Sequence, residues 1–179
     1  MNQNHQIEKQ LANKFQLEDL RSGFQIIRNE KGWRENEIRI EYIWLIIFDR
    51  AFFGKGGILN IKYEARRFRE IDNKEKLTKL LFAIDEKGNL GSAFQEDEDE
   101  NFTNIIPAFK EADLFEANRG ITLDGIIYRI KLISNNITTT IEVNNPNHKS
   151  WEKLENEIWK MGTDLANKSK NENLKNLFK

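Results

Sequence analysis

Apolar residues near the start of the chain recur every four positions, which is the spacing of an amphipathic helix. Ile7, Leu11 and Phe15 follow this spacing and predict a helix over roughly residues 4–20. Gly23 follows as the kind of residue that commonly ends a helix. We therefore expect an N-terminal helix with one apolar face.

From Phe24 to Val143 the period of the pattern changes from four residues to two. The segment Ile38–Phe48 alternates and is rich in β-branched and aromatic residues, as is typical of a strand. Its second half is apolar on both sides, so we expect that end to be covered on both faces. The segment Leu59–Arg66 has polar residues between the apolar ones and predicts a strand with one covered face.

Two further pairs of alternating segments are separated by short turn-forming stretches. Residues 80–84 and 90–94 flank the sequence DEKGN, and residues 125–133 and 137–143 flank Asn135-Asn136. Asn tolerates the left-handed backbone that tight hairpin turns require. Strands joined by such turns pair antiparallel, so we expect an antiparallel β-meander.

The sheet pattern stops at Asn144-Asn145-Pro146-Asn147, and a helical pattern follows over about residues 149–168. We expect this long C-terminal helix to pack on the sheet. The predicted fold is α+β: one domain over residues 1–179, with a polar, frayed tail at about 169–179. The apolar stripe of the helix consists of Trp151, Leu154, Ile158, Met161 and Leu165.

Trp159 does not belong to that stripe, since it points about 120° away from its middle. Gly162 and Ala166 lie beside it on the same side and are small enough to admit another element. One interpretation is that Trp159 packs under a loop or under the N-terminal helix. The other is that it anchors a protein partner, because Trp is enriched at interface hot spots.

The composition excludes several kinds of chemistry. There is no cysteine, which removes disulfides, thiolate nucleophiles and Cys-ligated metal centres. The net charge of −1 lacks the basic excess typical of a nucleic-acid binder. The longest apolar run, Tyr42–Phe48, is too short to cross a membrane, and the first 15 residues show no signal-peptide run. We expect a soluble cytoplasmic protein that binds neither nucleic acid nor membrane.

Two segments are candidates for contact with a partner. The loop Ala51–Gly57 is rich in glycine but lacks the spacing of a phosphate-binding loop; its Phe52 and Phe53 either form exposed contacts or cap the core. The acidic run consists of Glu96, Asp97, Glu98, Asp99 and Glu100. It lacks the ligand order of a calcium loop, and is either a mobile loop or a surface that steers a basic partner.

Catalytic signals are few. The chain has two histidines, His5 and His148, and neither a G-x-S-x-G nor an H-E-x-x-H motif. We therefore expect no catalytic residue, no metal and no cofactor. A carboxylate enzyme would require convergence of two or three of Asp49, Glu64, Asp72, Asp85 and Glu86.

Three functions follow, in order of preference. The first is a non-enzymatic protein-binding module, such as a bacterial inhibitor or immunity-type protein, which would use Trp159, Phe52-Phe53 and the acidic run. The likeness to that group is one of class alone. The second is a binder of small apolar ligands, with a cavity between the curved sheet and the C-terminal helix. The third is a metal-dependent carboxylate enzyme.

Overall fold

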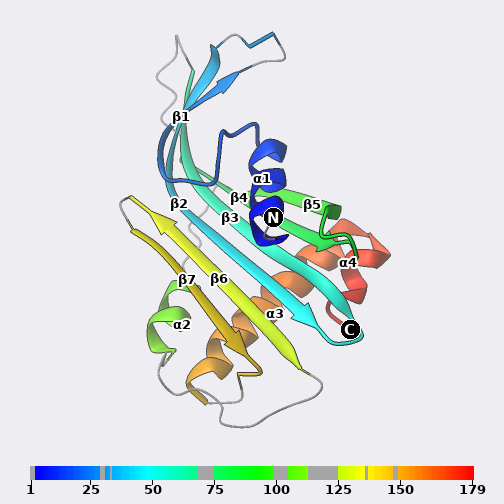
Figure 1. Cartoon of the computed structure of the whole chain (residues 1–179). Helices are drawn as coiled ribbons and strands as arrows, with labels where there is room; N and C mark the ends of the chain where they lie inside the picture. The colour runs from blue at the N-terminus through cyan, green and yellow to red at the C-terminus, as the bar shows by residue number, and fades with distance from the viewer. Residues whose placement is uncertain are drawn as a thin grey trace.

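The computed structural model describes residues 3–28, 31–32, 34–67, 75–98, 105–112, 125–135, 137–146 and 149–179. These residues form an antiparallel sheet with helices on both faces (Figure 1), which confirms the predicted α+β class. The elements are α1 (Gln3–Lys14), β1 (Gly23–Arg28), β2 (Arg34–Arg50), β3 (Gly54–Arg67), β4 (Glu75–Ile84), β5 (Leu90–Glu98), α2 (Ile105–Glu111), β6 (Ile126–Ser134), β7 (Ile137–Asn144), α3 (Lys149–Ser169) and α4 (Glu172–Asn176).

The sheet is organised around β2, which has 17 residues. Strands β2 to β5 follow one another as a meander, and the hairpin β6–β7 joins the opposite side of β2, giving the order β5-β4-β3-β2-β6-β7. The first half of β2 pairs with β1 and its second half pairs with β6. The β2–β3 register shifts between Ile40 and Tyr42, and such a bulge bends a strand. Beyond it, β1, β2 and β3 extend away from the rest of the sheet (Figure 1).

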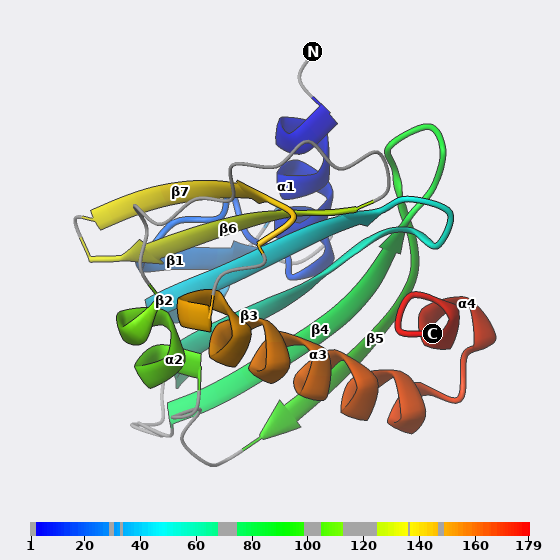
Figure 2. The ribbon, with the colours of Figure 1, turned by 90° about the horizontal axis from the view of Figure 1, so that it is seen from below.

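Each face of the sheet carries its own core. Helices α2, α3 and α4 lie on one face and α1 lies on the other (Figure 2). Ile46 and Phe48 of β2 belong to the α3 side, whereas Leu45 and Ile47 belong to the α1 side. The doubly apolar half of β2 is therefore covered on both faces, as its sequence predicts.

The predicted strands and hairpins are present, and the helix boundaries differ in one place. Helix α1 ends at Lys14 instead of near residue 20, because Gln16 adopts a left-handed backbone with φ of 57°. The amide of Leu17 then donates to the carbonyl oxygen of Ala12 at 2.9 Å, which turns the chain toward β1. Strand β1 and helix α2 were not anticipated from the sequence.

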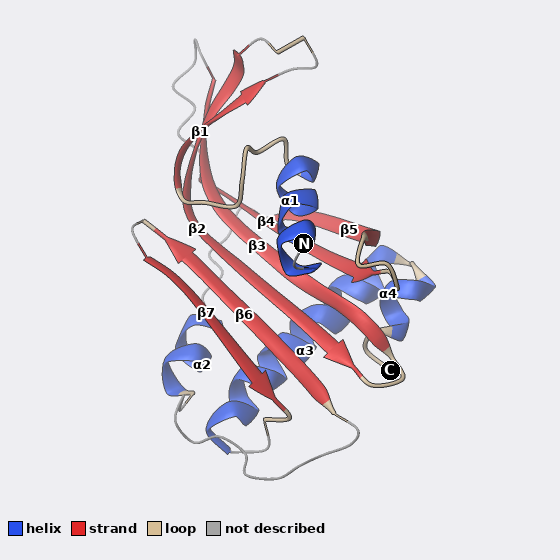
Figure 3. Ribbon diagram, viewed as in Figure 1, coloured by secondary structure: helices blue, strands red, loops and turns tan. Residues whose placement is uncertain are grey.

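The last eleven residues are not a frayed tail, contrary to the expectation. Asn171 caps α4, its side chain accepting hydrogen bonds from the amides of Asn173 and Leu174. Leu174 and Leu177 are 0% and 4% exposed. These apolar side chains dock the segment, so that the C-terminus lies beside the turn between β2 and β3 (Figure 3).

Candidate functional site

The turn between β2 and β3, residues 51–53, projects an aromatic side chain into solvent. Phe52 is 90% exposed, and Phe53 is 47% exposed. Phe52 also has a left-handed backbone, with φ of 68°, which a bulky residue rarely adopts. The interpretation of Phe52 as a cap on the core is therefore wrong, and the alternative of an exposed contact matches its position.

Arg50, at the end of β2, joins this turn to the C-terminal part of the chain. Its guanidinium carbon lies 4.0 Å from the centroid of the Phe53 ring and 4.8 Å from that of Trp159. Its Nη1 donates a hydrogen bond of 3.2 Å to the carbonyl oxygen of Leu177. Stacking on two aromatic rings and a hydrogen bond restrict the side chain. We call Arg50, Phe52, Phe53 and Trp159 the aromatic turn cluster.

Trp159 is half-buried behind the turn. Its Nε1–H donates a 2.7 Å hydrogen bond to Oη of Tyr128, which in turn donates to Oε1 of Glu155 at 2.7 Å. Burial, and then the hydrogen bond to Glu155, raise the pKa of the Tyr128 phenol well above its usual value. Centroid distances of 6.2 and 5.1 Å separate the Trp159 ring from those of Phe48 and Phe178. These contacts match the interpretation in which Trp159 packs under another segment.

That segment is the C-terminal one, and neither a loop nor the N-terminal helix. A Cβ atom added at Gly162 would lie 2.1 Å from Cε1 of Phe178, so the Phe178 ring occupies the space that the glycine leaves open. The expectation that another element approaches closely beside Trp159 is thus confirmed, and the element is the chain's own end.

The glycines of the predicted loop also serve packing. Cβ atoms added at Gly56 and Gly57 would lie 2.7 Å from Cδ1 of Leu177 and 2.5 Å from the carbonyl oxygen of Ile46. Both residues belong to β3 and pair with β2 and β4. Close contact with the C-terminal segment and with β2 accounts for these two glycines, without any bound phosphate.

The acidic run lies elsewhere, and the structure describes only part of it. Glu96 and Asp97 belong to β5, so the expectation of a mobile loop is wrong for both. Oε1 of Glu96 pairs with Nζ of Lys168 at 2.9 Å, and Oδ1 of Asp97 accepts a hydrogen bond from Thr78 at 2.7 Å. The side chain of Glu98 and the residues Asp99 and Glu100 lie outside the described part of the chain.

The acidic run is also distant from the aromatic turn cluster. Glu96 lies opposite Lys79, which in turn lies opposite Asn60 of β3. Asn60 is six residues beyond the start of β3 at Gly54, or about 20 Å along an extended strand. The structure therefore brings Trp159 and Phe53 together through Arg50, with Phe52 next to Phe53 in the turn, and leaves Glu96 and Asp97 apart from them.

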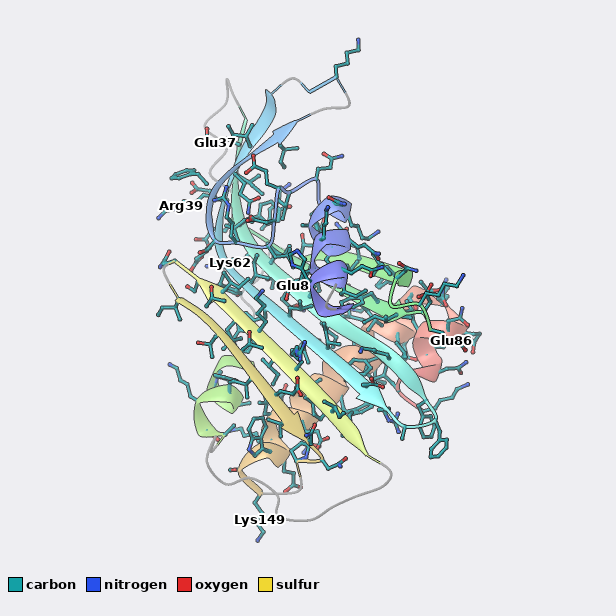
Figure 4. All side chains as sticks on the ribbon, viewed as in Figure 1. Glu8, Glu37, Arg39, Lys62, Glu86 and Lys149 are labelled. Atoms are coloured by element: carbon teal, nitrogen blue, oxygen red, sulfur yellow. The ribbon has the colours of Figure 1, made fainter. Side chains whose placement is uncertain are left out.

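The carboxylates proposed for an enzyme do not converge among the described residues. Asp49 forms an ion pair with Lys55 at 3.6 Å, and Asp85 accepts the amide hydrogens of its own turn, which lower its pKa. Glu86 lies on that turn, far from Arg39, which lines the pocket that contains Glu64 (Figure 4). No group of three or more His, Cys, Asp or Glu in the described part of the chain has metal-binding geometry. Asp72 and His148 lie outside the described residues.

A polar pocket of about 360 Å³ contains Glu64, the remaining member of that set. Next to it, Nζ of Lys62 pairs with Glu41 at 2.7 Å and with Glu75 at 3.1 Å. The hydrogen bond to Glu41 is the main cause that raises the Lys62 pKa. The Lys62 ammonium is thus held by two carboxylates at the edge of this pocket. The other lining residues are Arg39, Glu41, Tyr63, Glu75 and Asn135.

No protein-family model, curated protein or solved structure matches the chain. In the described part of the chain, no helix has both the length and the apolar character needed to cross a bilayer.

Proposed function

We propose that the protein is a non-enzymatic protein-binding module whose anchor is the Phe52 side chain. The observation that carries the proposal is that Phe52 is both 90% exposed and left-handed. An exposed phenylalanine gains almost nothing from folding, and a left-handed backbone costs a non-glycine residue roughly 1–2 kcal/mol. A partner pocket that buried the ring would contribute about 1.5–3 kcal/mol.

The residues behind Phe52 support an anchor that is ordered before binding. Arg50 is held by the Leu177 carbonyl oxygen and stacks against Phe53, so the base of the turn has few alternative conformations. A contact that is already in its bound conformation loses less entropy on association. Arginine and aromatic residues are also enriched in interface hot spots.

Within this proposal, the complex resembles those of bacterial inhibitor or immunity-type proteins, because the protein binds its partner at fixed stoichiometry and catalyses no reaction. This is a comparison of class. Cytoplasmic action is part of the proposal, because a chain without cysteine needs no oxidising compartment. The acidic residues Glu96 and Asp97 remain candidates for a second, separate contact.

The test is native mass spectrometry of the tagged protein purified gently from its host, compared with Phe52→Gly. Glycine removes the ring and accepts the left-handed backbone, so the variant keeps its fold. We expect a partner protein to co-purify with the wild type at fixed stoichiometry. We expect that partner to be absent from the Phe52→Gly preparation. The matched control is Phe24→Ala, which removes another exposed phenylalanine, 49% exposed on β1.

Two outcomes would contradict the proposal. If the partner remained bound to Phe52→Gly, the turn would not be the anchor. If the wild type carried only a small adduct that denaturation released, the protein would be a ligand binder.

A further inference from the structure

Strand β7 is the outermost described strand of the sheet beyond β6. Residues 137–140, 142 and 144 are exposed, and no described strand pairs with β7 on that side. Natural edge strands are usually protected by proline, lysine, a bulge or a covering element. The sequence ITTTIEVN has no such residue, its register with β6 is continuous, and its one charge is Glu142.

The direction of each backbone group of β7 follows from one hydrogen bond. The amide of Asn145 donates to the carbonyl oxygen of Ile126 at 2.8 Å, so this pair is hydrogen-bonded. Antiparallel pairs alternate between hydrogen-bonded and non-hydrogen-bonded. Ile141, Thr139 and Val143 therefore direct their backbone groups toward β6. The residues that direct them outward are Thr138, Thr140, Glu142 and Asn144.

We propose that β7 pairs antiparallel with β7 of a second copy of this chain, with Ile141 facing Ile141 across a two-fold axis. This axis is perpendicular to the sheet, so the two sheets become continuous and both α3 helices lie on the same face. Thr140 of one copy then lies opposite Glu142 of the other, and Thr138 lies opposite Asn144. These pairs form about eight new backbone hydrogen bonds.

The outward groups restrict the register. An outward residue can pair only with another outward residue, which removes every register shifted by one position. A shift by two toward the C-terminus would place Glu142 opposite Glu142, where like charges repel. A shift by two toward the N-terminus would place Thr140 opposite itself and would form fewer hydrogen bonds. The proposed register avoids both problems.

Side chains on both faces complement one another in this arrangement. On the α3 face, Ile130 of β6 lies next to Ile141, so the apolar row continues into Ile141 and Ile130 of the second copy. On the α1 face, Glu142 has Arg129 of its own chain on one side. On its other side it has Thr140 of the second copy, so no like charge lies opposite it. The apolar row through Ile141 and the absence of opposed like charges favour a second copy over a peptide of arbitrary sequence.

The interface consists of one strand from each copy and is therefore small. We expect a dimer that forms reversibly at high protein concentration. Sedimentation equilibrium of the wild type should show the mass rising with concentration from 21.2 kDa toward twice that value. Thr140→Pro removes an outward amide and leaves the bonds to β6 intact. It should weaken the dimer by about tenfold or more.

The matched control is Thr140→Ala, which removes the same side chain but keeps the amide, and should dimerise like the wild type. Circular dichroism and thermal melting check that both variants are folded. A wild type that stays monomeric at every concentration would overturn the proposal. Equal dimerisation of Thr140→Pro and Thr140→Ala would also overturn it.

A cross-link tests the register itself and does not depend on proline. The chain has no cysteine, so Ile141→Cys gives a single thiol. Across the two-fold axis the two Cα atoms would lie about 4.5 Å apart, within the range of a disulfide. Oxidation should link Ile141→Cys into a covalent dimer and leave Thr140→Cys largely monomeric. The reverse result would contradict the proposed register. Phe52→Gly should dimerise normally, since this inference does not depend on the proposed anchor.

Discussion

The contact between Gly162 and Phe178 can be tested through the stability of Gly162→Ala. It predicts that this substitution destabilises the protein, which is the opposite of its usual effect in a helix. Replacing Gly162 by Ala inside a helix normally stabilises it by about 0.8–1.0 kcal/mol. In this protein the new Cβ would lie 2.1 Å from the Phe178 ring, so the ring must move. It would lose its contacts with the rings of Phe48 and Trp159, whose centroids are 5.3 and 5.1 Å away.

The magnitude follows from those contacts. Each aromatic pair is worth about 0.5–1.5 kcal/mol, and the burial of a half-buried phenylalanine adds about 1 kcal/mol. The loss of roughly 2–4 kcal/mol exceeds the gain in helix propensity. Gly162→Ala should therefore destabilise the protein by about 1–3 kcal/mol, which would lower its Tm by several degrees.

Urea unfolding of four proteins measures this: the wild type, Gly162→Ala, Phe178→Ala and the double variant. Without the Phe178 ring, Gly162→Ala should stabilise the protein by about 1 kcal/mol, since only helix propensity remains. A double-mutant cycle isolates the interaction between the two positions. If Gly162→Ala stabilised the protein in both backgrounds, Phe178 would not occupy the space beside Gly162.

Three further predictions concern the sheet and its turn. Gly57→Ala should destabilise the protein by about 3 kcal/mol in urea unfolding, because its Cβ would lie 2.5 Å from the Ile46 carbonyl oxygen and 2.6 Å from the Phe82 ring; an unchanged stability would contradict this. Phe52→Gly should leave the free energy of unfolding unchanged or raise it by up to about 1 kcal/mol, which thermal melting would show as an equal or higher Tm. A large loss of stability would show that Phe52 belongs to the core. Burial raises the pKa of Tyr128 above its unfolded value of 10.0, so the folded state retains a proton that the unfolded state loses and stability should fall above about pH 10; Tyr128→Phe should flatten that fall.

The sheet was predictable because its signals are local. The apolar period of two in β2, with both faces apolar after Tyr42, is visible in the sequence, and so is the Asn135-Asn136 turn. The attachment of the β6–β7 hairpin to β2, on the side opposite β3, was not predictable. Strand order depends on contacts between distant segments, and no single segment encodes it.

The C-terminal segment shows why the aromatic turn cluster was only partly predictable. The stretch KSKNENLKNLFK is mostly polar, and its apolar residues Leu174, Leu177 and Phe178 are too few to indicate a packed element. They gain stability only from a surface formed elsewhere, by Gly56, Gly162 and their neighbours. The one signal available was the pair of small residues beside Trp159, which predicted a close approach without identifying the segment. Arg50 gave no signal, since its role depends on that same docking.

The proposed anchor and the proposed dimer use separate surfaces and are compatible. The Phe52 turn lies next to the start of β6, where the amide of Ala51 donates to the carbonyl oxygen of Gly125. Strand β6 thus separates the turn from β7. Antiparallel pairing of two β7 strands would place the two turns at opposite ends of the joined sheet, and both would stay exposed. A dimer would then present two anchors, and a partner with two matching sites would bind more tightly than to either alone. Loss of the dimer in Thr140→Pro would remove that gain but not the single-site contact, whereas Phe52→Gly would remove the contact itself.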